Sequence, residues 1–264
     1  MDYIIKAYLK NIFNDDVTNI IFKYYYIDYM EEKKEYIKTF LSMGFVIFPC
    51  NIDKTPRIKR WNYKNMYYST KLYNSKIKNN YNSTDPYLNN IGLLTGKNSK
   101  IIVIDIDFKD NGILIWNMLL DKFNNGNKID TLTVSSGNRG RHLYFKLPDR
   151  LSYLNSSNRL FIDNNNNKYG IDIRCNNGYI ILPPSIHPNS NIYKFDNIYT
   201  PYDLDRTLIK NIPDWLNNIL YTFYKKNSYI NKEVVTNKIL INNILNLDDT
   251  LNKKNYHKYN TLRY

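Results

Sequence analysis

The sequence predicts a mixed fold of the α/β type (α+β), with short strands in the middle of the chain and helices at both ends. The middle of the chain contains short apolar runs bounded by Gly, Pro and Asn, a pattern typical of strands joined by turns. Glycine-containing turns separate two pairs of these runs, which predicts hairpins. The outer segments carry apolar residues at spacings of three and four with few breakers, which predicts helices.

The first half of the chain begins with helices and then alternates between strand and loop. Gly44 ends the best helical pattern, because glycine readily adopts the left-handed backbone that terminates a helix. A buried strand follows, and Pro49 is expected to end it. The expected elements are one or two helices over 1–30, a helix over 31–43, a strand over 45–48, a polar loop with a short helix over 51–90, strands over 91–95 and 100–108, and a helix over 112–123.

The second half of the chain contains the two expected hairpins and then the C-terminal helices. The first hairpin closes across a glycine-rich loop, and the second closes across the Asn-Asn-Gly sequence at 176–178. The expected elements are strands over 131–135, 141–147, 169–174, 179–182 and 191–195, helices near 202–224 and 232–247, and a frayed tail from residue 248.

The composition predicts a reduced, intracellular protein. The 264 residues include only two cysteines, Cys50 and Cys175, which are too few for a disulfide framework. With only three histidines beside them, no structural zinc site is expected. No apolar run approaches the roughly 18 residues that a membrane helix needs, and no signal-peptide pattern is present. We therefore expect a cytoplasmic location and no membrane partner.

The formal net charge of +13 favours a polyanionic partner such as nucleic acid. Asn, Ile, Lys and Tyr are abundant and have AT-rich codons, so part of the lysine excess reflects an AT-rich genome, such as that of a virus, plasmid or other mobile element. Gly and Arg are scarce against that background, so their positions are informative. Eight of the nine glycines lie between residues 92 and 178, together with Arg139, Arg141 and Arg174.

Two aspartates interrupt the apolar strand expected over 100–108. Alternate residues of a strand point to opposite faces, so Asp105 and Asp107 share one face while isoleucines fill the other. Side chains two residues apart on a strand are about 6.5 to 7 Å apart. Two carboxylates at that spacing can share a pair of divalent metal ions about 3.5–4 Å apart. A strand end that dips into solvent would carry aspartates too, so a third ligand is needed to decide.

Asp172 is the candidate third carboxylate. It shares one face of its strand with Gly170 and Arg174, while Ile171 and Ile173 fill the other face. A surface ion pair between Asp172 and Arg174 is the alternative interpretation.

The loop over 135–142, with the sequence Ser-Ser-Gly-Asn-Arg-Gly-Arg-His, predicts an anion-binding site. Its two glycines allow backbone amides to point inward as a nest for phosphate. His142 is expected on a polar strand face with Tyr144 and Lys146, outside the core. A basic hairpin turn without a ligand is the alternative. The candidate nucleotide-binding residues are Ser136, Gly137, Arg139, Gly140, Arg141, His142 and Arg174.

Two further segments are candidates for contacts to nucleic acid or nucleotide. Lys54 opens a basic stretch that ends at Trp61, a combination that can contact phosphate and stack on a base. Ser185 and His187 lie in a rigid proline-rich turn and could reach a ligand. A solvated loop and a purely structural turn are the alternatives. The stretch over 92–99 does not fit a P-loop, because only three residues separate its glycines, and this excludes an ATPase motor.

Taken in order, these segments resemble the bifunctional primase–polymerase (prim-pol) domain of the archaeo-eukaryotic primase superfamily. The resemblance covers roughly residues 31–216. Many members carry a Ser-x-His pattern where this chain has Gly140, Arg141 and His142, so the serine hydroxyl is missing here. The motifs that carry the resemblance lie at 44–49, 54–61, 91–96, 101–107, 136–145, 171–174 and 183–187.

The resemblance implies an RRM-like antiparallel catalytic sheet with an N-terminal α/β lobe and C-terminal helices. It implies a DNA primase/polymerase, a nucleotidyltransferase that performs template-directed, divalent-metal-dependent nucleotidyl transfer in DNA replication. Asp105, Asp107 and Asp172 would be the catalytic residues that bind Mg²⁺ or Mn²⁺, and His142 would contact the triphosphate of the incoming nucleotide. The expected partners are a single-stranded DNA template, nucleoside triphosphates and a replicative helicase, either fused or separate.

The expected organisation is a helical extension over 1–30, a catalytic domain over 31–216 and a helical tail or linker over 217–264. Two other functions stay open. A metal-dependent nucleotide-sugar glycosyltransferase would use Asp105 and Asp107, but it leaves Asp172 and the His142 loop without a role. A single-stranded nucleic-acid-binding module with a degenerate site would account for the charge, and its binding would not depend on metal.

Overall fold

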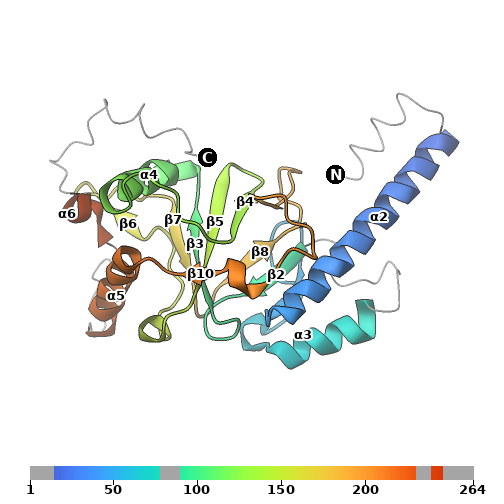
Figure 1. Cartoon of the computed structure of the whole chain (residues 1–264), viewed down its shortest axis with the longest axis horizontal. Helices are drawn as coiled ribbons and strands as arrows, with labels where there is room; N and C mark the ends of the chain where they lie inside the picture. Colours follow the sequence, from blue (N-terminus) through green and yellow to red (C-terminus); the bar gives the residue numbers. More distant parts are fainter. Residues whose placement is uncertain (1–14, 78–89, 230–238, 246–264) are drawn as a thin grey trace.

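The computed structural model describes residues 15–77, 90–229 and 239–245 (Figure 1). It has a mixed α/β fold of antiparallel sheets and several helices, which confirms the predicted fold class. The α-helices are α2 (Asp15–Ser42), α3 (Met66–Leu72), α4 (Gly112–Phe123), α5 (Asp214–Tyr229) and α6 (Ile241–Leu245).

Six of the described strands form the larger sheet, in the order β7-β3-β5-β4-β9 with β10 beside β5. Neighbours along that order are antiparallel, whereas β10 runs parallel to β5. A smaller antiparallel sheet has the order β1-β2-β8, and β6 pairs with β11. The strands are β1 (Ile47–Cys50), β2 (Asn90–Leu94), β3 (Ile101–Ile106), β4 (Thr133–Ser136), β5 (Gly140–Lys146), β6 (Phe161–Ile162), β7 (Ile171–Arg174), β8 (Tyr179–Leu182), β9 (Lys194–Phe195), β10 (Lys210–Asn211) and β11 (Ile239–Leu240).

The larger sheet is apolar on both faces, so it separates two hydrophobic clusters. The alternation along β3 shows this directly, because Ile101 and Val103 belong to one cluster while Ile102, Ile104 and Ile106 belong to the other. The first cluster also contains side chains of α2 and of the smaller sheet. The second contains side chains of α4 and α5, which lie at the other end of the molecule (Figure 1). Asp105 therefore interrupts the face that belongs to the first cluster.

The helix α2 is continuous from Asp15 to Ser42. The predicted boundary between an N-terminal extension and the catalytic domain, at residue 31, therefore falls inside one helix. Residues 1–14 of that extension lie outside the described residues. Gly44 follows the helix with a φ of +74°, the left-handed conformation that was expected to end it. The predicted helix over 112–123 matches α4 at both ends.

The prediction that Pro49 ends the first strand is wrong, because β1 includes it. Pro49 lies opposite Ile91 of β2, and β1 is an edge strand of its sheet. An edge strand tolerates proline, since the missing N–H is needed on one side only. The carbonyl of Pro49 accepts a hydrogen bond from the N–H of Arg57 at 2.9 Å.

The predicted hairpin across residues 176–178 is also wrong, because β7 and β8 belong to different sheets. The Asn176 side chain explains the path of the chain. Its amide nitrogen donates to the carbonyls of Ser152 and Leu154, at 2.7 and 2.8 Å, and its oxygen accepts the N–H of Lys97 at 3.0 Å. These bonds hold the turn against two other segments, so the chain crosses between the sheets instead of folding back on β7.

The helix predicted over 202–224 begins only at Asp214, after Pro213. Residues before it form a short helical turn, Arg206–Leu208, and the strand β10. Asp205 caps that turn by accepting the N–H of Thr207 at 2.5 Å. Most of the predicted helix over 232–247, and the whole tail from 248, lie outside the described residues. The described part of that predicted helix contains the short helix α6. Among the helices that the structure describes, none is long and apolar enough to cross a membrane.

Candidate active site

Three of the predicted site residues lie side by side in one row across the larger sheet. Asp105 of β3 is the register partner of Asp172 on β7 and of His142 on β5. Residues that face each other across antiparallel strands point to the same side of the sheet. Asp107 follows the last residue of β3 and lies one step further along the same face. The pairing of β3 between β5 and β7 thus brings together side chains from three separate parts of the sequence.

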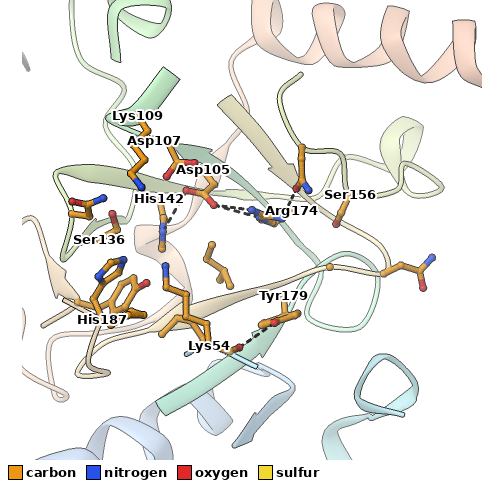
Figure 2. A pocket seen from close by; sticks show the side chains of 18 of the residues that line it. Lys54, Asp105, Asp107, Lys109, Ser136, His142, Ser156, Arg174, Tyr179 and His187 are labelled. Carbon is orange, nitrogen blue, oxygen red and sulfur yellow. Dashed lines mark hydrogen bonds and ion pairs between the residues drawn. The ribbon is translucent and has the colours of Figure 1, made fainter. Parts of the chain in front are cut away.

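Asp105, Asp107 and His142 line a pocket of about 710 Å³ on that side of the larger sheet, and Asp172 is joined to the pocket through Arg174 (Figure 2). The wall opposite the carboxylates comes from Lys54, Trp61 and the strand β8. The pocket contains cationic side chains beside the carboxylates, so it can hold negative charge as well as a metal ion. Its ionisable residues are Lys54, Asp105, Asp107, Lys109, His142, Arg174, Tyr179, His187 and Tyr193.

Arg174 lies between two of the carboxylates. Its Nη2 donates to Oδ2 of Asp172 at 2.6 Å and to Oδ2 of Asp105 at 3.2 Å. A further hydrogen bond joins Nη1 to the side-chain oxygen of Asn158 at 2.8 Å. The predicted alternative, an Asp172–Arg174 ion pair, is therefore present, but it is largely buried in the pocket and includes Asp105.

Burial shifts the pKa values of two of the carboxylates, Asp107 and Asp172. Burial, followed by the negative charges of Asp105 and Asp172, raises the pKa of Asp107 to about 6. Burial also raises the pKa of Asp172, although Arg174 opposes that shift. The backbone N–H of Arg159 donates to Oδ1 of Asp172 at 2.7 Å and fixes this carboxylate in place.

The donor set suits a hard divalent cation, because Mg²⁺ and Mn²⁺ prefer carboxylate oxygens. The raised pKa of Asp107 is consistent with carboxylates that repel one another and that a cation would relieve. Within the described ranges, no three His, Cys, Asp or Glu side chains already form a metal cage. Arg174 lies between Asp105 and Asp172, so a metal ion shared by these two carboxylates would displace its guanidinium.

The prediction that His142 lies outside the core is wrong. His142 is only 4% exposed, and Tyr144 on the same face is completely buried in the first cluster. Burial lowers the pKa of His142 to about 4, so the imidazole is neutral. Its Nε2 lies 3.5 Å from Oδ1 of Asp105, and the Tyr193 ring packs beside it at 5.7 Å between centroids. Among the described residues, Nδ1 of His142 has no hydrogen-bond partner.

The two loop arginines that were predicted to join His142 lie elsewhere. Arg141 alternates with His142 along β5, so it points to the opposite side of the sheet and pairs with Asp196 at 2.9 Å. Arg139 has a φ of +61° and places its guanidinium 4.1 Å from the centroid of the Phe108 ring. Neither lines the pocket described above.

The small residues of the loop support its shape. Ser136 lines the pocket. The carbonyl of Gly137 accepts hydrogen bonds from the side chains of Asn189 and Asn191, at 2.9 and 2.6 Å. A Cβ at Gly140 would lie 2.7 Å from both the carbonyl of Ile106 and Oγ of Ser136, so only glycine fits without a shift.

The candidates from the two further segments, 54–61 and 185–187, divide in the same way. Lys54, Trp61 and His187 line the pocket, and His187 lies 5.8 Å from Tyr193 between ring centroids. Ser185 is fully buried, and its hydroxyl accepts the backbone N–H of Ile91 at 2.8 Å. Ser185 therefore has the structural role that the alternative interpretation gave to its turn.

Sequence reasoning missed Lys109, Tyr193 and Arg159. Lys109 follows the aspartate strand in a short helical turn and points into the pocket (Figure 2). Tyr193 lies between the two pocket histidines and is one of 26 tyrosines, so composition gave no signal. Arg159 could have been found, because it is a scarce arginine in the same glycine-rich region as Arg174.

Comparison with protein-family models matches residues 38–215 to the family described as bifunctional DNA primase/polymerase, N-terminal. The match covers about two thirds of the chain. The chain belongs to this family. The resemblance seen in the sequence is thus confirmed, and every residue that lines the pocket lies within the matched primase/polymerase domain. A search of curated proteins found no significant match.

Proposed function

We propose that this primase/polymerase domain catalyses template-directed, divalent-metal-dependent nucleotidyl transfer, as primer synthesis, primer extension or both. The observation that carries the proposal is the row formed by Asp172, Asp105 and His142, with Asp107 beside it, together with the cation-containing pocket that Asp105, Asp107 and His142 line. In the reaction, the 3′-hydroxyl of the growing strand gives its proton to solvent, and its oxygen forms a bond to the α-phosphorus of a nucleoside triphosphate. The bond from that phosphorus to the β-phosphate oxygen breaks, and pyrophosphate leaves.

The three carboxylates would hold the metal. When bound there, Mg²⁺ or Mn²⁺ supplies positive charge to the attacking oxygen and the leaving pyrophosphate. Arg159 keeps Asp172 in position through its backbone N–H. Arg174 would leave the two carboxylates and move to a nucleotide phosphate, since a guanidinium binds either oxyanion well. This exchange keeps the charge of the pocket balanced before and after the nucleotide binds.

The cations on the pocket walls would bind the triphosphate. Lys54 and Lys109 both line the pocket and approach it from different sides of the carboxylate row (Figure 2). His142 would contact the triphosphate through the ring edge that faces the pocket. As a neutral imidazole it offers a hydrogen-bond donor without adding charge beside Asp105.

Ser136 would replace the hydroxyl that many family members carry two residues before the histidine. Gly140 occupies that position here, and Ser136 is its register partner on β4. Oγ of Ser136 lies 2.7 Å from the point where a Cβ of residue 140 would be. The hydroxyl would therefore come from the neighbouring strand.

The template would be single-stranded DNA, held mainly through its phosphates. The net charge of +13 supports such a partner. A replicative helicase, fused or separate, would open duplex DNA for an enzyme of this kind. The proposed setting is DNA replication, including that of a virus, plasmid or other mobile element.

The test is a synthesis assay with single-stranded template, labelled nucleotides and Mg²⁺ or Mn²⁺, run with and without a primer. The proposal predicts products that require template and metal and that disappear with a chelator. Template binding that persists in chelator, with no product under any condition, would favour the single-strand-binding module. Transfer from a nucleotide sugar, with no nucleic-acid product, would favour the glycosyltransferase.

A further inference from the structure

The segment over 54–77 has an unusual charge pattern. It contains seven of the 37 Lys and Arg residues of the chain and none of its 24 Asp and Glu residues. An AT-rich genome favours lysine, but it does not explain the absence of acidic residues, whose codons are AT-rich as well. The segment also carries one tryptophan and four tyrosines. Its composition combines positive charge with aromatic rings, as single-strand-binding surfaces do.

The fold gives this segment an inner and an outer side. The inner side packs against the first hydrophobic cluster through Ile58, Trp61, Met66, Tyr68, Leu72 and Tyr73. Further contacts fix the backbone, since Asn98 donates to the carbonyl of Lys64 at 2.8 Å and Tyr179 donates to that of Lys54 at 3.0 Å. The outer side is exposed and consists of Arg57, Lys59, Arg60, Tyr63, Tyr67 and Lys71. The outer residues are thus displayed on a rigid support.

The two outer tyrosines are exposed far more than a core-packing role requires. Tyr63 is 78% exposed and Tyr67 is 73% exposed. The Lys71 ammonium lies 6.0 Å from the centroid of the Tyr67 ring. Across the described residues, Lys59, Lys64 and Lys71 form no ion pair with a carboxylate. These side chains are available for phosphates and bases.

The surface is continuous with the pocket, because Lys54 and Trp61 at its start line the pocket wall. From Trp61 the chain leads outward through the Trp61–Tyr63 turn to α3, which lies at the opposite end of the molecule from α4 (Figure 1). We infer that the outer side of residues 57–71 binds single-stranded DNA and leads the template strand into the pocket. Lysines on this surface contact phosphates, and Tyr63 and Tyr67 stack on bases. The inference rests on the proposed function for the identity of the strand as template.

The experiment measures the binding of a fluorescently labelled oligothymidylate, in chelator, so that no catalysis takes part. One variant combines Tyr63→Ala with Tyr67→Ala. A second combines Lys59→Gln, Lys64→Gln and Lys71→Gln. Its matched control carries the same charge change outside this surface, through Lys122→Gln, Lys128→Gln and Lys146→Gln, which are exposed.

The tyrosine variant should bind about 30-fold more weakly or worse, because each lost stacking contact weakens binding several-fold at least. The lysine variant should lower the log–log salt slope by about 2, at roughly 0.7 per phosphate contact, while the control triple changes it little. Affinities within about twofold of wild type for both variants would overturn the inference. The exposed surface would then be assigned to contacts with a protein partner. An equal loss in the control triple would overturn the inference too, because binding would then depend on the net charge of the protein and not on this surface.

These outcomes are separable from failure of the proposed function. If neither the wild type nor any variant synthesises DNA, but the tyrosine and lysine variants still lose binding, the surface assignment is supported and the catalytic proposal is refuted. If wild type synthesises DNA and the surface variants bind and extend normally, the catalytic proposal stands and the surface assignment falls.

Discussion

Replacing Asp107 by asparagine should stabilise the folded chain at neutral pH, although it removes a proposed catalytic carboxylate. The pKa of Asp107 is raised from its ordinary value of 3.8 to about 6 by burial and by its carboxylate neighbours. The folded state therefore holds this proton more tightly than the unfolded state does. This proton adds its full contribution to the free energy of unfolding below pH 3.8, the pKa of Asp107 in the unfolded state. The contribution is lost as the pH rises through about 6, the pKa in the folded state.

The size of the effect follows from the two pKa values. Their difference corresponds to at most about 3 kcal/mol at neutral pH. Because the Asp107 side chain is only partly buried, solvent screening reduces this, and we expect the variant to gain about 1–2 kcal/mol. Urea unfolding of both proteins without metal, from about pH 4 to 7.5, measures the difference. The gain should shrink as the pH falls below 6.

The difference between the two proteins is the useful quantity, because His142 titrates in the same range with the opposite sign. Asp149→Asn is a matched control, since Asp149 is exposed on a turn outside the pocket. A variant that is less stable than wild type at neutral pH would refute the electrostatic reasoning. So would a gain that is equal in the control or independent of pH.

Three further predictions concern the neighbours of this carboxylate. The pKa of His142 is lowered from 6.5 to about 4, so the stability that the neutral imidazole contributes is lost as the pH falls below 6.5. His142→Gln should therefore resist unfolding in acid better than wild type, as measured by urea unfolding near pH 5. Arg174→Gln should weaken nucleotide binding about tenfold or more by calorimetry, because it removes a charge-assisted contact, while oligothymidylate binding should stay unchanged. Gly170→Ala should destabilise the fold by several kcal/mol in thermal unfolding, because its Cβ would collide with the backbone oxygen of Lys109. Unchanged acid stability, unchanged nucleotide affinity or an unchanged melting temperature would contradict the respective prediction.

The alternation of side chains along single strands was readable from the sequence. Ile102, Ile104 and Ile106 of β3 fill the face opposite the aspartates as expected, and Asp105 interrupts the other face. The bounds of α4 were also predictable, because the apolar spacing and the glycine at its start are local signals. The sequence singled out the carboxylates and the histidine as candidates, but it did not predict how they are arranged.

The arrangement depended on contacts between distant segments. His142 was assigned to a polar face because its neighbours on that face, Tyr144 and Lys146, are both able to face water. The face is in fact buried up to Tyr144, since the smaller sheet and Tyr193 cover it, and only Lys146 is exposed. The prediction of a hairpin at 176–178 was wrong for a related reason, because the Asn176 side chain forms hydrogen bonds to residues that no local pattern identifies.

The most direct test of the account is single-nucleotide extension of a primed template by Asp105→Asn and Asp107→Asn, with Asp149→Asn as the control and unfolding curves to show that each variant is folded. Both site variants should lose at least about a thousandfold in rate, equivalent to ~4 kcal/mol, because they remove charge that the metal-assisted transfer needs. The control should keep the wild-type rate, and all three should bind oligothymidylate as wild type does. A folded Asp105→Asn or Asp107→Asn protein that extends the primer at near the wild-type rate would contradict the assignment of this pocket as the catalytic centre.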